Sequence, residues 1–98
     1  MWLLETDGAS EPSFTFRMLP GAVKTIGRAP RADFIVDAPL VSRVHCRLSA
    51  GAAELEVEDL SSTNGIFVND QRVTRAVLRS GDRLRVGRVL FVIARAAD

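Results

Sequence analysis

The 98-residue sequence has only one cysteine, Cys46, so no disulfide can form within the chain. Such cysteine usage is typical of a reducing compartment. The longest strongly apolar run, residues 89–94, is far too short to span a bilayer. The apolar residues 1–4 are followed at once by Glu5 and Asp7, which argues against a signal peptide. We therefore expect a soluble, cytoplasmic protein that does not bind membranes.

The chain also has almost no net charge and few aromatic residues. The net charge is +1, from 13 basic and 12 acidic residues, and aromatic residues make up 6% of the chain. This balance gives no general attraction to nucleic acid, and the few aromatic rings offer no platform for stacking bases. All basic residues except Lys24 are arginine, which suits bidentate contacts with anions, although a GC-rich genome also raises arginine content.

The residues needed for common kinds of catalysis are missing. The chain has one histidine, no glycine-rich loop that ends in lysine, and no spacing typical of metal ligands. We therefore expect no enzymatic activity, no cofactor and no metal.

What the sequence does contain is a series of short apolar runs, each ended by a turn signal. With 47% hydrophobic residues, it can bury the core of one domain. No segment has a convincing helical stripe, although Val73, Ala76 and Val77 have helical spacing before Gly81. The pattern predicts an all-β fold, either an antiparallel sandwich or a barrel. The expected strands are residues 2–4, 14–18, 23–26, 34–36, 45–48, 55–58, 66–68, 84–86 and 89–94.

Three short motifs lie between these runs and are expected to form loops at a sheet edge. They are Gly27-Arg28, Ser42-Arg43-Val44-His45 and the segment Ser61-Ser62-Thr63-Asn64-Gly65. Together they offer a planar cationic fork, hydroxyl groups and a side-chain amide. These donors suit a phosphate ester on a peptide.

The third motif is the most specific of the three. By itself it predicts a hairpin loop between residues 55–59 and 66–68, with Asn64-Gly65 supplying positive φ. Such a loop would expose the Thr63 hydroxyl and the Asn64 amide. If strands simply alternate in direction, the loops of Ser42 and Thr63 lie at the same end of the sheet. Alternation does not bring Arg28 to that end.

Taken together, the motifs and their spacing resemble the forkhead-associated (FHA) domain. The resemblance extends from Val23 to Ile93 and includes Gly81-Asp82 followed by Leu84. It implies an FHA/SMAD-like antiparallel β-sandwich of about eleven short strands, in which two sheets cross over to bring Arg28 to the other loops. It also implies binding of phosphothreonine peptides. We expect residues 1–98 to form one FHA domain, cut from a longer protein.

The resemblance also assigns roles in peptide binding. Arg28, Ser42 and Thr63 match residues that contact phosphate, and Arg43 reaches either the phosphate or the peptide. Asn64 matches a residue that hydrogen-bonds the peptide backbone.

The loop of Leu40 and Val41 matches the segment that reads the residue three places after the phosphothreonine. It predicts an apolar preference there, with Arg43 or Arg47 as a rival cationic contact. The residues expected to support the site are Gly27, His45, Gly65 and Asn69, the last also as a turn former.

His45 has three possible roles. As a catalytic base it could act on Ser42, three residues earlier. As a metal ligand it lacks companions, since the adjacent Cys46 points to the opposite face of a strand. As a structural residue it would brace the binding loops through its ring nitrogens, which is its role in FHA domains and the role we expect.

Two functions are compatible with these residues. The first is a non-catalytic module that binds a phosphothreonine-containing protein or peptide, such as a Ser/Thr kinase or its substrate. The alternative is a phospho-independent scaffold or oligomerisation domain of FHA fold. In that case the acidic edge of Glu54, Glu56 and Glu58 could pair between molecules with the arginine-rich stretch 72–88.

Overall fold

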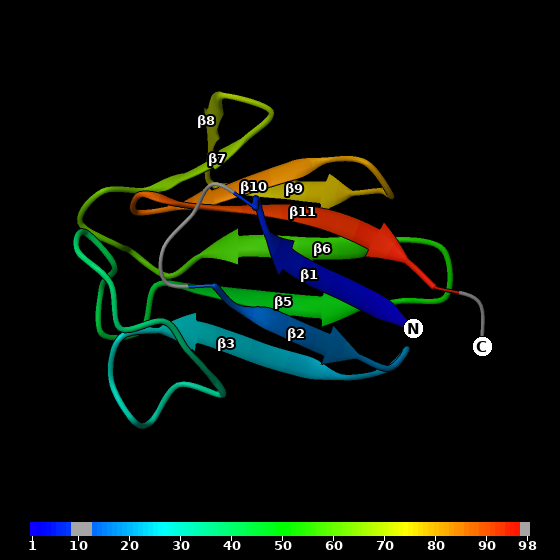
Figure 1. The fold of residues 1–98 in the computed structure, drawn as a ribbon, viewed down its shortest axis with the longest axis horizontal. Coiled ribbons are helices and arrows are strands. Elements are labelled where there is room, and N and C mark those ends of the chain that lie inside the picture. The colour runs from blue at the N-terminus through cyan, green and yellow to red at the C-terminus, as the bar shows by residue number, and fades with distance from the viewer. Residues whose placement is uncertain (9–12, 97–98) are drawn as a thin grey trace.

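The structure is a computed structural model that describes residues 1–8 and 13–96. These residues form two β-sheets packed face to face (Figure 1). The strands are β1 (Trp2–Thr6), β2 (Thr15–Met18), β3 (Val23–Gly27), β4 (Phe34–Ile35), β5 (Cys46–Ala50), β6 (Leu55–Asp59), β7 (Ile66–Val68), β8 (Gln71–Val73), β9 (Arg75–Leu78), β10 (Arg83–Val86) and β11 (Val89–Arg95).

The first sheet has the strand order β2-β1-β11-β10-β7-β8, and the second has the order β4-β3-β5-β6-β9. The expectation of an antiparallel β-sandwich of about eleven short strands is confirmed. One pair departs from it, because β4 runs parallel to β3.

Alternation of side chains builds the core between the sheets. In β11, Val89, Phe91 and Ile93 are buried, whereas the residues between them are half-buried on the outer face. The continuous apolarity of this strand therefore reflects one core face and one partly covered outer face. Trp2 in β1 is also buried, and its indole N–H donates to the Gly51 carbonyl at 2.8 Å.

The helical spacing around Val73 and Val77 was misleading. These residues lie in β8 and β9, and none of the described residues is helical. The segment alternates instead, so that Ala76 packs on the core while Val77 is exposed. Across residues 1–8 and 13–96, no helix is long and apolar enough to cross a membrane.

Three loops gather at one end of the sandwich, called here the loop end. They are residues 28–33, 38–45 and 60–65, and they lie on the left in Figure 1. The start of β1 and the end of β11, which pair through Trp2 and Arg95, lie at the opposite end.

The expectation that a crossing of the two sheets brings Arg28 to the other loops is wrong. The strands β3, β4 and β5 share one sheet, so no crossing between sheets is involved. Because β4 runs parallel to β3, the next strand β5 can pair antiparallel with β3, through Ile26 and Cys46. This pairing places the end of β3 beside the start of β5.

Cys46 is fully buried in the core. Burial raises the pKa of its thiol to about 12, and the nearby charge of Asp59 acts in the same direction. The thiol therefore stays neutral at physiological pH and behaves as a small apolar side chain.

Candidate functional site

Arg28 leaves the end of β3 beside the 38–45 loop. Its backbone N–H donates to the Ser42 carbonyl at 2.9 Å, and its Nε donates to the Val41 carbonyl at 3.2 Å. The guanidinium is therefore held through Nε. Its two terminal amino groups have no protein partner among the described residues, so a planar pair of donors faces outward.

Gly27 is needed because the backbone approaches too closely for a side chain. A Cβ at this position would lie 2.1 Å from the Arg43 carbonyl oxygen and 2.9 Å from Cα of Val44. The φ of Gly27 is not positive, so this position requires the absence of a Cβ rather than an unusual backbone conformation.

His45 connects two of the three loops from a fully buried position. Its Nδ1 accepts a hydrogen bond from the Ser42 N–H at 2.9 Å, and its Nε2 lies 2.8 Å from the Gly65 carbonyl oxygen. Because Nδ1 is an acceptor, the neutral ring carries its proton on Nε2 and donates to Gly65. The imidazole thus ties the 38–45 loop to the 60–65 loop.

The 60–65 loop is not a hairpin, contrary to the sequence interpretation. It crosses from β6 in the second sheet to β7 in the first. Positive φ occurs at Ser61 and Gly65, at 56° and 76°, rather than at Asn64. The loop is shaped by side chains, since the Ser62 hydroxyl donates to Asp59 and accepts from the Gly65 N–H.

The sequence motif included Ser62, but the roles of Ser62 and Asp59 in shaping this loop were not predicted. Their i, i+3 spacing at the end of a strand is a recognisable turn signal, because short polar side chains often bond to nearby backbone.

Two further hydrogen bonds join the loops on their exposed side. The Ser42 hydroxyl accepts from the Thr63 N–H at 3.1 Å, and the Asn64 side-chain N–H donates to the Leu40 carbonyl at 3.1 Å. The loops of Ser42 and Thr63 therefore do lie at the same end, as strand alternation predicted. The Ser42 O–H, the amide oxygen of Asn64 and its second N–H remain available to a ligand.

These loops enclose an open pocket of about 520 Å³. None of the described residues that line it is a carboxylate, whereas two are arginines, so this lining carries positive charge. It is lined by Arg28, Leu40, Val41, Ser42, Arg43, Val44, Ser61, Thr63 and Asn64.

Leu40 and Val41 differ in what they can offer to a ligand. Leu40 has a positive φ of 70° and is 48% exposed, whereas Val41 is only 4% exposed. Below this loop lies Gly87, where a Cβ would be 2.9 Å from the Pro39 carbonyl oxygen and 3.0 Å from Val41. Leu40 is therefore the apolar side chain that this loop presents outward.

The two arginines considered as rivals at this position lie in different places. Arg43 lines the pocket. Arg47 points to the outer face of the second sheet, where it forms an ion pair with Glu58.

Asn69 lies at the far end of β7 from the pocket, so it cannot support the binding loops directly. Asn69, with a φ of 50°, and Asp70, with a φ of 69°, form the hairpin turn between β7 and β8, so the prediction that Asn69 forms a turn is confirmed. Its side chain accepts from the Arg83 N–H at 3.0 Å and donates to Asp82 at 3.1 Å. The support it gives is to the first sheet.

Asp33 closes the loop that carries Arg28. Its carboxylate accepts from the Thr25 N–H at 2.9 Å. This bond holds the pKa of Asp33 below its usual range, and the Thr25 hydroxyl and the Lys24 charge act in the same direction. Because the folded pKa is lowered, the contact stabilises the loop at neutral pH and is lost only as the pH falls through that folded pKa.

Comparison with known proteins identifies the family. The chain matches the family model of the FHA domain over residues 24–87, so it belongs to the FHA domain family. It is 40% identical over 80 residues to the ABC transporter ATP-binding/permease protein Rv1747 of Mycobacterium tuberculosis, covering 82% of this chain and 9% of that protein. It is 35% identical over 82 residues to the oxoglutarate dehydrogenase inhibitor of Corynebacterium efficiens, covering 82% and 58%. The chain thus spans only part of the curated relatives it matches.

Solved structures agree with the fold. The FHA domain of CT664 from Chlamydia trachomatis superposes with a TM-score of 0.89 at 24% identity, covering 98% of both chains. The FHA domain of FhaA, solved with the intracellular domain of Rv3910, gives 0.83 at 30% identity, covering 95% of this chain and 99% of the other. EmbR of Mycobacterium tuberculosis, solved with a low-affinity phosphopeptide, gives 0.82 at 26% identity, covering 99% and 25%.

Proposed function

We propose that this chain is a non-catalytic module that binds phosphothreonine-containing peptides at the loop end. The observation that carries the proposal is the guanidinium of Arg28. Its Nε donates to the Val41 carbonyl, which restrains the guanidinium in a pocket that Ser42 also lines and that has no carboxylate among its described lining residues. A fork fixed in this way suits two oxygens of a phosphate and loses little entropy on binding.

The other pocket residues have complementary roles. The Ser42 and Thr63 hydroxyls can donate to the remaining phosphate oxygen, and Arg43 adds a second positive charge. The free amide oxygen and N–H of Asn64 can pair with the backbone of an extended peptide, and the exposed Leu40 can contact an apolar residue farther along it. None of these groups requires a metal or a cofactor.

Known relatives support this chemistry. EmbR was solved with a phosphopeptide, and the FhaA domain was solved with an intracellular domain of another protein. By analogy, the partner of this chain is a phosphorylated protein in the cytoplasm, such as a Ser/Thr kinase or its substrate.

The alternative of a phospho-independent scaffold is less well supported. It relied on pairing the acidic edge with arginines of another molecule. In the structure, Glu54, Glu56 and Glu58 pair within the chain, with Arg79, Arg75 and Arg47 respectively. The acidic edge is therefore already neutralised.

A calorimetric titration with matched peptides tests the proposal. The phosphothreonine peptide is expected to bind with an affinity on the order of micromolar, because a few charge-assisted hydrogen bonds act against the cost of ordering the peptide. The unphosphorylated peptide should show no measurable binding. Affinity should also fall from pH 7.5 to 5, since the second phosphate pKa is about 6. Equal binding of both peptides would favour the scaffold alternative instead.

A further inference from the structure

The outer face of the first sheet carries a row of side chains beside the pocket, called here the arginine row. It consists of Arg72 in β8, Phe67 in β7, Arg85 in β10 and Leu90 in β11. These residues are direct cross-strand partners: Arg72 pairs with Phe67, Phe67 with Arg85 and Arg85 with Leu90. They therefore lie on one face in one line across four neighbouring strands.

Phe67 holds Arg85 in place. The guanidinium carbon of Arg85 lies 4.2 Å from the centroid of the half-buried Phe67 ring, a cation–π contact. Stacking uses the face of the guanidinium and leaves its N–H edges free for carboxylate oxygens. Arg85 is thus an oriented cation.

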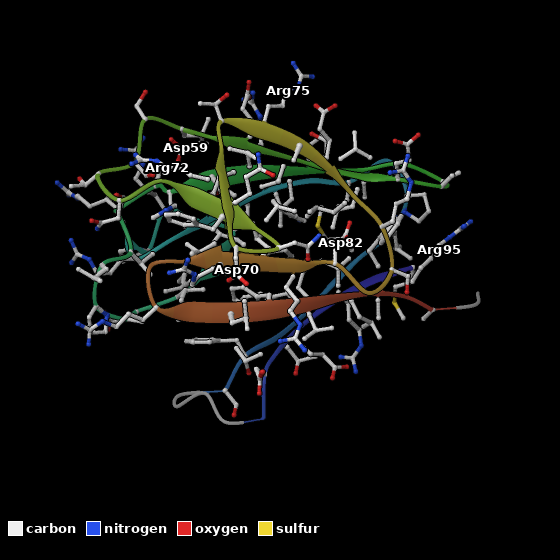
Figure 2. All side chains as sticks on the ribbon, turned by 90° about the horizontal axis from the view of Figure 1, so that it is seen from above. Asp59, Asp70, Arg72, Arg75, Asp82 and Arg95 are labelled. Atoms are coloured by element: carbon white, nitrogen blue, oxygen red, sulfur yellow. The ribbon has the colours of Figure 1, made fainter. Side chains whose placement is uncertain are left out.

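The row lies next to two of the loops that form the pocket, but none of its residues lines the pocket. A Cβ at Gly65 would lie 2.6 Å from Nε of Arg72, so this guanidinium lies against the loop of Thr63 and Asn64. On the other side, the turn at Gly87 packs against the Pro39–Val41 segment. Figure 2 shows Arg72 at the same end of the molecule as Asp59, with Arg95 toward the other end.

Among the described residues, the two arginines of this row lack an ion-pair partner, unlike those of the second sheet. Arg47, Arg75 and Arg79 each have a carboxylate within 4.0 Å. Within residues 1–8 and 13–96, neither Arg72 nor Arg85 has one. Within the arginine-rich stretch, Arg75 and Arg79 pair with glutamates and Arg83 with Asp7, so Arg72 and Arg85 are better placed to attract an external acidic group.

From this arrangement we infer that the arginine row is a second recognition surface, which binds an acidic segment on the same chain as the phosphothreonine. The inference rests on the proposed function. Four strands set about 4.8 Å apart span about 14 Å, the length of about four or five extended residues. A short run of Asp or Glu, a few residues away from the phosphothreonine, fits this surface in length and charge. The position read by Leu40 remains apolar.

Binding of fluorescent peptides at low and high salt tests the inference. One phosphothreonine peptide has neutral flanks, and two others carry a run of four glutamates. In one of these the run begins five residues before the phosphothreonine, and in the other it begins five residues after it. Unphosphorylated forms complete the set. We expect one acidic phosphopeptide to bind roughly three- to tenfold more tightly than the neutral one at low salt, with the advantage shrinking at high salt.

Two double variants with the same change in charge locate the effect. Arg72→Gln with Arg85→Gln should abolish the acidic advantage and leave binding of the neutral phosphopeptide unchanged. Arg75→Gln with Arg79→Gln, on the other sheet, should keep the advantage. The inference is overturned if the wild type has no acidic preference, or if both double variants lose it equally. If the neutral phosphopeptide binds no better than its unphosphorylated form, the proposed function fails as well, and that comparison separates the two failures.

Discussion

Arg28→Ala is expected to lower the affinity for a phosphothreonine peptide by more than about 100-fold while the domain stays folded. Each hydrogen bond to a charged group contributes about 1.5–3 kcal/mol, and this variant removes two donors from the phosphate together with the charge. The cost in stability should stay within about 1 kcal/mol, because the Arg28 side chain is exposed and makes one bond to the Val41 carbonyl. Calorimetric titration and thermal melting measure the two effects.

Two further variants separate charge from geometry. Arg31→Ala removes the same charge from the same loop, outside the pocket lining, and should bind within about twofold of the wild type. Arg28→Lys keeps the charge but loses both the fork and the Nε bond, so most of the affinity should still be lost. Normal binding by Arg28→Ala with normal melting would remove Arg28 from the site.

His45→Ala is expected to cost the domain a large part of its stability. It leaves the Ser42 N–H and the Gly65 carbonyl without their buried partner and opens a cavity. The cost should be about 3–5 kcal/mol. For a domain of this size that corresponds to a fall in Tm of more than about 12 °C. At a temperature where the variant is folded, phosphopeptide binding should also weaken, because two loops are no longer tied.

Cys46→Ala provides the matched control. It removes a buried side chain at the next position that makes no hydrogen bond in the described structure, so only a small cavity results. We expect a loss of about 1–2 kcal/mol and unchanged binding. If His45→Ala melts like the wild type, the bracing role of the imidazole is contradicted.

The strands were largely predictable because alternation is a local property. Residues 55–58 alternate apolar and acidic side chains, and β6 buries Leu55 and Val57 while its glutamates face outward. The hairpin at Asn69 was predictable for the same reason, since the dipeptide itself favours positive φ.

Connections that depend on distant partners were not predictable in this way. Nothing near Phe34 and Ile35 indicates that β4 runs parallel to β3, yet this single choice of direction brings Arg28 to Ser42. Likewise, residues 60–65 have the composition of a hairpin loop, but β7 pairs with β10 rather than with β6. Which sheet a strand joins depends on the packing of the whole core.

The candidate site was predictable in its residue types and less so in its contacts. Hydroxyl, amide and guanidinium groups at loop positions already indicated an anion. The sequence could not reveal that Gly27 must lack a Cβ because of the Arg43 carbonyl, or that Arg72 lies against Gly65. Both contacts join segments from different parts of the chain.

The most direct test of the account is to map the binding site by NMR. A ¹⁵N-labelled domain is titrated with a phosphothreonine peptide, and changes in the backbone amide shifts are followed residue by residue. We predict that the largest changes cluster at the loop end, at Arg28, Ser42 and Thr63, and that the unphosphorylated peptide causes none there. Changes centred instead on the outer face of the second sheet, around Glu56 and Val77, would contradict it.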